Sequence, residues 1–364
     1  MNVKRYIFKK ASANHIPVSG NFELTPRCNF CCEMCYIRMS PEEADAVGTE
    51  LTTDEWLAIG RQAVDAGMVY LLLTGGEPLI RRDFAGIYTG LAEMGVVLSL
   101  NTNGTQVTDE TVRCLKEHPP EKVNVTLYGA SPESYQAVCG NPHGYEQALR
   151  GIRLLREAGI SVCINTTYTR HNATDMEKIV ALAREEGIPI RMTSYLFPPV
   201  RRAGDTDASC YLTPEEYGRL GAAFDRLSMT EAQMGRRKDL IQRVKALSQD
   251  DSPQKEDTIP TEGRAASCMA GRGAFWVTWD GQLLPCGMLP HLAKELKGHT
   301  FAEVWDGFDG IMDTQCLPAA CSVCPKRVIC PVCVAVTQCG KAVPQALCRY
   351  TDSYMTSFCT GEND

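Results

Sequence analysis

Short apolar runs alternate with longer amphipathic segments between residues 22 and 196. The run Met68–Leu73 is apolar throughout, which is typical of a strand covered on both faces. A capping box at residues 52–55 (TTDE) precedes it and opens a segment with apolar residues at helical spacing, which Gly67 closes. The unit recurs, and the pattern predicts six strands: Phe22–Thr25, Met68–Leu73, Val96–Leu100, Val123–Leu127, Ile160–Thr166 and Ile188–Leu196.

Helical patterns separate these strands, and consecutive parallel strands are joined by right-handed crossovers. The expected fold is therefore α/β, a partial (β/α)6 TIM-like barrel that carries its chemistry at the carboxyl ends of the strands. The helices between the strands are expected at residues 52–67, Phe84–Met94, Thr108–Glu117, Tyr145–Ala158 and Asp175–Glu186.

The flanking segments have a different character. Residues 1–20 show little pattern and are expected to form a short extended arm, and residues 40–50 are expected to be a surface loop. Residues 213–248 predict one or two charged helices, and Phe275–Leu284 predicts a hairpin that turns at Asp280-Gly281. The predicted division is an arm at 1–20, the barrel at 21–200, a helical bridge and linker at 201–265, and a cysteine-rich, loop-rich domain at 266–364.

Composition excludes several function classes. The net charge of −7 over 364 residues argues against a general nucleic-acid binder. No apolar run reaches the length of a membrane span, and the first residues lack an apolar signal core, so a cytoplasmic protein is expected. The cytosol keeps thiols reduced, so the 18 cysteines are expected to be metal ligands and buried thiols rather than disulfides.

Four cysteines lie within eight residues directly after the first predicted strand. Cys28, Cys32 and Cys35 form a C-x3-C-x2-C set, and Cys31 is expected to point away from it. Three thiolates on one loop suit a 4Fe–4S cluster whose fourth iron is open to a non-protein ligand. A zinc knuckle or a set of reactive thiols is the alternative at this point.

The second predicted strand ends in Gly75-Gly76-Glu77-Pro78. Paired glycines let the backbone approach a ligand closely, Glu77 offers a carboxylate, and Pro78 restricts the turn. The sequence is no phosphate-binding loop, because no Gly-Lys-Ser/Thr follows it.

The cysteine set after the first strand, Gly-Gly-Glu-Pro after the second, and the sixfold βα pattern together resemble the radical S-adenosylmethionine (SAM) superfamily over roughly residues 20–200. The resemblance implies that SAM chelates the open iron, that residues 75–78 bind its amino end, and that its cleavage yields a 5′-deoxyadenosyl radical. It also suggests SAM or substrate contacts at the strand ends, with simple turn chemistry as the alternative: Asn101, Asn103, Thr126 and Asn165. Met34 stands where the family usually has an aromatic residue and could face adenine, and Arg191 could hold a carboxylate inside the barrel.

The tail carries a second group of cysteines, and its two C-x2-C pairs indicate metal, with zinc as one possibility. Their pattern resembles the SPASM extension, which holds two auxiliary 4Fe–4S clusters. The resemblance assigns Cys268, Cys286 and Cys333 to the first auxiliary cluster, and Cys321, Cys324, Cys330 and Cys348 to the second. The first has only three cysteines, because position 262 is Glu where some members have an extra cysteine. Cys316 and Cys339 fall outside the motif and are interpreted as ordinary thiols.

Enzymes of this type mostly oxidise or crosslink peptides and proteins, and auxiliary clusters suit a net oxidation. The expected function is thus a ribosomal peptide maturase, a radical SAM oxidoreductase acting on a peptide or protein. It would need an external flavodoxin- or ferredoxin-type electron donor, and a separate leader-binding protein is one way to recognise the substrate. Sulfatase maturation is disfavoured, because Gly287 stands where those enzymes tend to have Asp. Two further hypotheses stay open, a small-molecule dehydrogenase of the same superfamily and a non-catalytic zinc or iron–sulfur protein.

Overall fold

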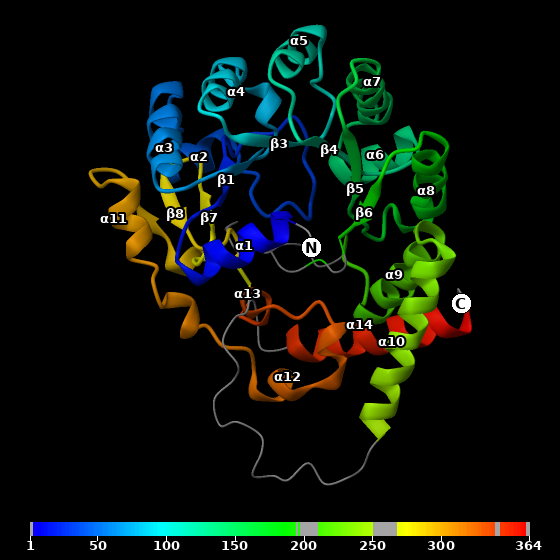
Figure 1. Cartoon of the computed structure of the whole chain (residues 1–364). Coiled ribbons are helices and arrows are strands. Elements are labelled where there is room, and N and C mark those ends of the chain that lie inside the picture. The colour runs from blue at the N-terminus through cyan, green and yellow to red at the C-terminus, as the bar shows by residue number, and fades with distance from the viewer. Residues whose placement is uncertain (1–2, 194–195, 197–209, 250–267, 339–342, 362–364) are drawn as a thin grey trace.

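A computed structural model describes residues 3–193, 196, 210–249, 268–338 and 343–361. Its sheet has the strand order β6-β5-β4-β3-β2-β1-β7-β8-β9, and β1 to β6 are all parallel (Figure 1). The predicted α/β fold with six parallel strands is confirmed. These strands are β1 Ser19–Glu23, β2 Tyr70–Thr74, β3 Val97–Thr102, β4 Lys122–Leu127, β5 Val162–Thr166 and β6 Ile190–Met192.

The connecting helices cover the outer, convex face of the curled sheet (Figure 1). Strand residues that face them are apolar and buried, as Leu71, Leu73 and Val125 show, whereas the alternate residues face the inside of the barrel. An additional helix, α6, lies in the connection after β4 where none is predicted. The helices are α3 Thr53–Asp65, α4 Phe84–Glu93, α5 Asp109–Glu117, α6 Pro132–Cys139, α7 Gly144–Glu157 and α8 Met176–Glu185.

The prediction for the N-terminal segment is wrong in two respects. Residues 1–20 include a helix, α1 Val3–Ala13, and β1 starts at Ser19 rather than Phe22. The helix lies against the first residues of the strands, where Lys4 Nζ is 2.6 Å from Glu121 Oε1 and the Phe8 ring is 5.3 Å from that of Tyr70. Tertiary contacts therefore stabilise a helix that has only one buried residue.

Residues 40–50 are also more ordered than predicted. They contain α2 Pro41–Val47, which begins with a capping box between Ser40 and Glu43. The polar composition of α2 hides it from a search for apolar periodicity, since only Ala44 is buried.

The hairpin of the tail extends the barrel sheet. Strand β7 Ala274–Val277 pairs in parallel with β1, so Trp276 lies opposite Asn21, and β8 Gln282–Leu284 and β9 Lys294–Glu295 continue the sheet antiparallel. The turn at Asp280-Gly281 is where the sequence predicts it. The predicted division at residue 266 remains a prediction, and the sheet runs across it.

Two long helices form the predicted bridge, α9 Pro214–Ser228 and α10 Glu231–Gln249. The last helix, α14 Val343–Thr360, packs along α9, and Tyr354 Oη donates a 2.5 Å hydrogen bond to Asp225 Oδ2. Shorter helices complete the tail: α11 Phe301–Asp306, α12 Ala319–Val323 and α13 Val334–Thr337. Among the helices described, none is both long and apolar enough to cross a membrane.

Candidate functional site

The cysteine loop is fastened to the turn after β2 by main-chain hydrogen bonds. The Gly76 N–H donates to the Thr25 carbonyl at 2.7 Å, and the Glu77 N–H donates to the Arg27 carbonyl at 2.9 Å. These bonds place the start of the loop, immediately before Cys28, against the Gly-Gly turn. The two motifs recognised in the sequence are therefore in direct contact.

Both glycines are required by this contact. A Cβ on Gly76 would lie 2.2 Å from the Arg27 carbonyl oxygen, and a Cβ on Gly75 would lie 2.7 Å from that of Thr25. Gly75 also has φ +148°, which side chains rarely adopt. The glycines thus let two backbones pack against each other beneath the cysteine loop.

Gly76→Ala is expected to lower the free energy of unfolding by about 3 kcal/mol, because the methyl group meets fixed backbone rather than a flexible side chain. It should also reduce the iron that the chain retains after anaerobic reconstitution. The matched control is Gly235→Ala in α10, where nothing lies within 4 Å of an added Cβ. That change should be neutral or stabilising by up to about 1 kcal/mol. Denaturant unfolding of both variants tests this, and equal stabilities would contradict it.

Glu77 differs from its expected role of offering a carboxylate to a ligand. The side chain is fully buried and accepts three hydrogen bonds from the protein: from the Leu79 N–H at 3.0 Å, the Thr102 hydroxyl at 2.8 Å and the Asn103 N–H at 2.6 Å. Burial raises the pKa of Glu77 to about 7 although the three donors oppose it. The carboxylate therefore joins the ends of β2 and β3, which leaves the backbone of the turn to face a ligand.

The three predicted cluster thiols lie close to one another on the loop. Cys32 is 6% exposed, and Cys28 and Cys35 are partly buried against the same apolar core. Burial first, and then the nearby charges of Glu77 and Cys35, raise the pKa of Cys28 to about 12. The exposed Cys31 thiol lies apart, as expected.

Nitrogen donors point at two of these sulfur atoms. The Phe30 N–H is 3.4 Å from Cys28 Sγ, and the Arg38 N–H is 3.2 Å from Cys35 Sγ. Asn103 Nδ2 lies 3.9 Å from Cys28 Sγ and donates to Asn29 Oδ1 at 2.8 Å. Donors to the ligating sulfurs are one means by which proteins adjust iron–sulfur clusters, so the loop fits such a group. Asn103, predicted as a SAM contact, lies at the cysteine loop.

An ionic network that sequence reasoning missed holds the base of the loop. Arg81 is 8% exposed and donates to the carbonyls of Leu24 at 2.7 Å and Leu51 at 3.0 Å. Its guanidinium also contacts Asp83 at 2.7 Å, and this bond is the main reason that the pKa of Asp83 falls to about 2. Glu50 accepts from Arg27 Nε at 2.6 Å and from Arg81 Nη1 at 3.4 Å. Apart from Asp83, which is two residues from Arg81, the partners are 23 to 57 residues apart, and no local sequence pattern predicts them.

Amide side chains line the inside of the barrel. Asn124 Nδ2 donates to Asn101 Oδ1 at 2.8 Å, whereas Asn124 Oδ1 is buried and has no partner within the described part of the chain. Thr126 faces the same side two residues on, opposite Asn165 of β5. Three of the predicted ligand contacts therefore lie on the inner face. A cavity of about 370 Å³ lies between this face and α1, toward the amino ends of the strands, and its lining includes Lys4, Phe8, Tyr70, Asn101, Asn124, Asn165 and Arg191.

An aromatic group lies beside the cysteine loop. The Tyr128 ring is in edge contact with Phe30 at 5.9 Å and with Tyr135 at 6.2 Å between centroids. Burial, and then the neighbouring thiols of Cys32 and Cys35, raise the pKa of Tyr128, which places its phenol near the sulfur atoms. Met34, predicted to face adenine, is 8% exposed and belongs to the main apolar core. Tyr128 belongs to the strand end 126–129, where the resemblance suggests SAM or substrate contacts, but its place beside a loop 93 residues before it is not predicted by the sequence.

Four thiols of the tail surround one small cavity. They come from α12, the turn after it and α14, and they are the four that the resemblance to the SPASM extension groups: Cys321, Cys324, Cys330 and Cys348. Burial, and then the other three thiols, raise the pKa of Cys321. In the part of the chain described, no three His, Cys, Asp or Glu side chains come together closely enough to hold a single metal ion. A four-iron cluster needs wider spacing, because each thiolate binds a different iron.

A separate apolar cluster of the tail consists of Leu289, Met312, Leu317, Val334 and Ala335, and Cys321 of the four-thiol set packs against it. Cys286 packs directly against it, whereas the thiols of Cys268 and Cys333 are exposed. Cys268, Cys286 and Cys333 do not line the cavity that the other four tail cysteines share. The Cys316 thiol donates to the Asp313 carbonyl at 3.8 Å, and Cys339 lies outside the described residues.

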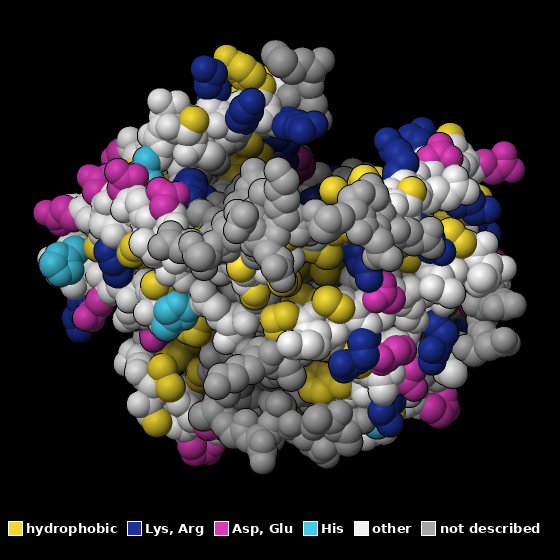
Figure 2. Space-filling view, turned by 90° about the horizontal axis from the view of Figure 1, so that it is seen from below, with side chains coloured by type: hydrophobic (Ala, Val, Ile, Leu, Met, Phe, Trp, Pro, Cys, Tyr) yellow, Lys and Arg dark blue, Asp and Glu magenta, His cyan; other side chains and the backbone are white. Residues whose placement is uncertain are grey.

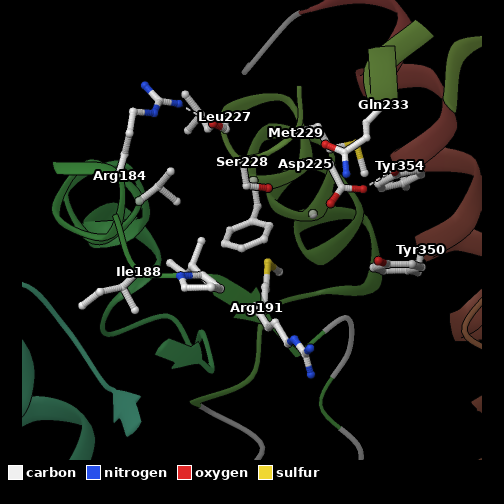
Figure 3. A pocket seen from close by; sticks show the side chains of 16 residues that line it. Arg184, Ile188, Arg191, Asp225, Leu227, Ser228, Met229, Gln233, Tyr350 and Tyr354 are labelled. Atoms are coloured by element: carbon white, nitrogen blue, oxygen red, sulfur yellow. Dashed lines mark hydrogen bonds between the residues drawn. The ribbon is translucent and has the colours of Figure 1, made fainter. Parts of the chain in front are cut away.

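A groove that the sequence does not predict lies beside β6, which is an edge strand of the sheet. It measures about 680 Å³ and separates β6 from α9 and α14 (Figure 3). Asp225, Tyr350 and Tyr354 line one side, Ile188 and Arg184 the other, and Arg191 extends at its lower end.

The underside of the molecule shows hydrophobic side chains near its middle and charged side chains of both signs toward its margin (Figure 2). That face carries no single basic patch, among the residues described, of the kind that binds nucleic acid.

Comparisons with known proteins agree with this geometry. Residues 22–183 match the model of the Radical SAM superfamily. The chain is 29% identical over 322 residues to the AdoMet-dependent heme synthase of Methanosarcina barkeri, covering 86% of this chain and 90% of that protein. It is 23% identical to the PqqA peptide cyclase of Rhizobium meliloti, covering 86% of this chain and 80% of that protein.

Two solved structures share the fold. Native anSMEcpe with bound AdoMet superposes with a TM-score of 0.69 at 16% identity, covering 95% of this chain and 98% of that one. Streptococcus suis SuiB bound to its precursor peptide SuiA superposes with a TM-score of 0.63 at 16% identity, covering 89% and 73%.

Proposed function

This chain contains a radical SAM domain, and from that premise we propose that it is an oxidising radical SAM enzyme that modifies a peptide at the carboxyl end of the barrel. SAM and a four-iron cluster, when bound, supply the hydrogen-abstracting radical. Cys28, Cys32 and Cys35 would hold the cluster, and the backbone of Gly75 and Gly76 would receive the amino end of SAM.

The observation that carries the proposal is the presence of a second thiol site in the same chain. Cys321, Cys324, Cys330 and Cys348 surround one cavity in the tail, far in sequence from the cysteine loop. A substrate that has lost a hydrogen atom must lose another electron to complete a two-electron oxidation, and a second cluster provides an acceptor. The remaining tail cysteines, Cys268, Cys286 and Cys333, would hold another auxiliary cluster with an incomplete set of protein ligands.

The inner wall of the barrel supports a peptide as the substrate. Asn101, Asn124 and Asn165 lie on the strands of this wall and offer amide groups that both donate and accept, which suits the main chain of a peptide. The PqqA peptide cyclase is among the relatives, which also favours a peptide. An enzyme of this kind would work with two partner proteins: an external electron donor and a separate protein that binds the leader of the substrate peptide.

A second candidate is oxidation of a tetrapyrrole. It is favoured by the 29% identity to a heme synthase over 90% of that protein's length. Arg191, which lines both the barrel cavity and the groove beside β6, would bind a carboxylate of such a substrate.

The deciding experiment uses anaerobically reconstituted, chemically reduced enzyme with SAM. One arm contains peptides encoded by small open reading frames beside the gene, and the other contains a tetrapyrrole precursor of heme. Formation of 5′-deoxyadenosine together with a mass loss of two hydrogens or a crosslink in the peptide supports the proposal. Turnover of the tetrapyrrole alone selects the second candidate, and zinc binding without SAM cleavage overturns both.

A further inference from the structure

Exposed hydrophobic side chains gather at the amino end of the barrel, around α1. Three of them, Val3, Tyr6 and Ile7, fall at positions i, i+3 and i+4 and therefore share one side of the helix. Val3 is 69% exposed and Tyr6 is 47% exposed. Of the ten large hydrophobic side chains that are exposed in the described part of the chain, six lie on α1 or beside it: Val3, Tyr6, Ile7, Ile16, Val69 and Val97. Single exposed side chains need no explanation, but a group of six marks a surface that another body covers.

The last three of these residues continue the surface onto the starts of the strands. A Cβ on Gly67 would lie 2.6 Å from Ile16 Cγ2, so Ile16 packs directly before β2. Two residues after Gly67, the Val69 carbonyl accepts a 2.8 Å hydrogen bond from the Val97 N–H. The next residue, Tyr70, is in ring contact with α1. The six side chains thus form one surface, here termed the amino-end patch.

Helix α1 is also basic. Its 11 residues include Lys4, Arg5, Lys9 and Lys10 and no carboxylate, in a chain whose net charge is −7. Lys4 pairs with Glu121 at 2.6 Å, whereas the other three basic residues are exposed. Lys10 Nζ lies 5.9 Å from the centre of an aromatic ring of the patch, so charged and apolar groups lie side by side. A helix that exposes basic and apolar side chains together is typical of a membrane-surface helix.

We propose that α1 and the amino-end patch bind the surface of an anionic lipid bilayer. The apolar side chains would enter the boundary between headgroups and acyl chains, while Lys9 and Lys10 bind lipid phosphates. A second copy of the chain fits this patch less well, because a twofold contact would bring the lysines of one copy against those of the other. An acidic electron donor also fits less well, because α1 lies at the start of β1 whereas the cysteine loop follows its end.

Binding at this end leaves the reaction site open. Helix α1 lies across the first residues of the strands (Figure 1), whereas the cysteine loop and the Gly-Gly turn follow their carboxyl ends. The carboxyl end of the barrel would therefore face away from the lipid and stay accessible to a substrate. The proposal goes beyond the proposed function and does not depend on it.

The test is flotation of the full-length chain with lipid vesicles. We expect the protein to rise with phosphatidylcholine vesicles that contain about one-third phosphatidylglycerol, and to stay behind with vesicles of phosphatidylcholine alone. Added salt should release it, because screening weakens the attraction between lysine and phosphate. Hydrogen-exchange mass spectrometry should show that the anionic vesicles protect residues 3–13 and leave the charged helix α10 unchanged.

Two double substitutions separate the two contributions to binding. Lys9→Gln with Lys10→Gln should lower the partition constant by about tenfold or more, because each basic residue near an anionic surface adds to the attraction. Val3→Ser with Ile7→Ser removes apolar contact with the acyl chains and should also weaken binding by about tenfold. All four side chains are exposed, so both variants should keep the thermal unfolding midpoint of the unaltered chain.

The matched control is Arg150→Gln with Arg153→Gln in α7, which removes two exposed charges from another helix and should leave vesicle binding unchanged. Equal binding to neutral vesicles, or binding that the α1 variants do not weaken, overturns the proposal. Absence of any flotation also overturns it and leaves an acidic protein as the occupant of the patch. Because flotation needs neither SAM cleavage nor a substrate, its failure is distinct from failure of the proposed function.

Discussion

Replacing Cys28, Cys32 or Cys35 singly with alanine is expected to abolish SAM cleavage, reducing 5′-deoxyadenosine to the level without enzyme. The three thiols lie on one loop and influence each other's charge, and the loop directs backbone N–H groups at two of them. A cluster with only two protein ligands would be lost or would present more than one open iron. The measurement is iron content after anaerobic reconstitution, followed by quantification of 5′-deoxyadenosine under reducing conditions.

Cys31→Ala is the matched control for this series. Its thiol is exposed and shares the loop, so the substitution tests whether any change in this segment suffices to remove activity. We expect Cys31→Ala to retain its iron and to cleave SAM at the rate of the unaltered chain. Cleavage by Cys28→Ala, Cys32→Ala or Cys35→Ala, or its loss in Cys31→Ala alone, would contradict the assignment of the ligands.

The barrel was predictable because its signals are local. Buried parallel strands such as β2 consist of consecutive apolar residues, and a capping box marks the start of α3 without reference to the rest of the chain. The two ligand-binding motifs could likewise be recognised from short spacings. Each of these features is read within about ten residues, which is the range over which a sequence pattern is informative.

The errors arise where a tertiary contact overrides a weak local signal. Helix α1 has one buried residue, yet Lys4 and Phe8 anchor it to Glu121 and Tyr70, which lie more than sixty residues away in the sequence. Glu77 was recognised as part of the site, but its role was not, because the donor groups come from the end of β3. Nothing within the motif distinguishes a carboxylate that faces a ligand from one that joins two strands.

Some residues that surround the cysteine loop could not be placed there from the sequence. Tyr128 and Cys139 reach the loop because β4 and β1 are three strands apart in a curled sheet, and α6 packs its end against the loop. Arg81 follows β2 and reaches Leu24, which follows β1, because these two strands are adjacent and parallel. The residues next to these side chains in the sequence form no recognisable motif, and only the folded sheet brings the side chains together.

Loss of a tail thiol should separate SAM cleavage from product formation. In Cys321→Ala we expect SAM to be cleaved at a substantial fraction of the normal rate, whereas modified product falls to background. The cysteine loop and the Gly-Gly turn are untouched by this change, because Cys321 lies in α12 and faces the cavity that it shares with Cys324, Cys330 and Cys348. Without a complete second site, the substrate radical would lack an acceptor for its second electron. Quantifying 5′-deoxyadenosine and product in the same reaction measures this uncoupling.

Cys316→Ala controls for general disturbance of the tail. Cys316 is a partly buried thiol only five residues before Cys321, and it contacts the Asp313 carbonyl rather than the four-thiol cavity. The variant should keep both its iron content and the ratio of product to 5′-deoxyadenosine. Iron content discriminates further, because Cys321→Ala should lose about one cluster's worth of iron, roughly four atoms per chain. Full coupling in Cys321→Ala despite that loss would show that the oxidation finishes without the second site, and the electron would then have to leave through another acceptor.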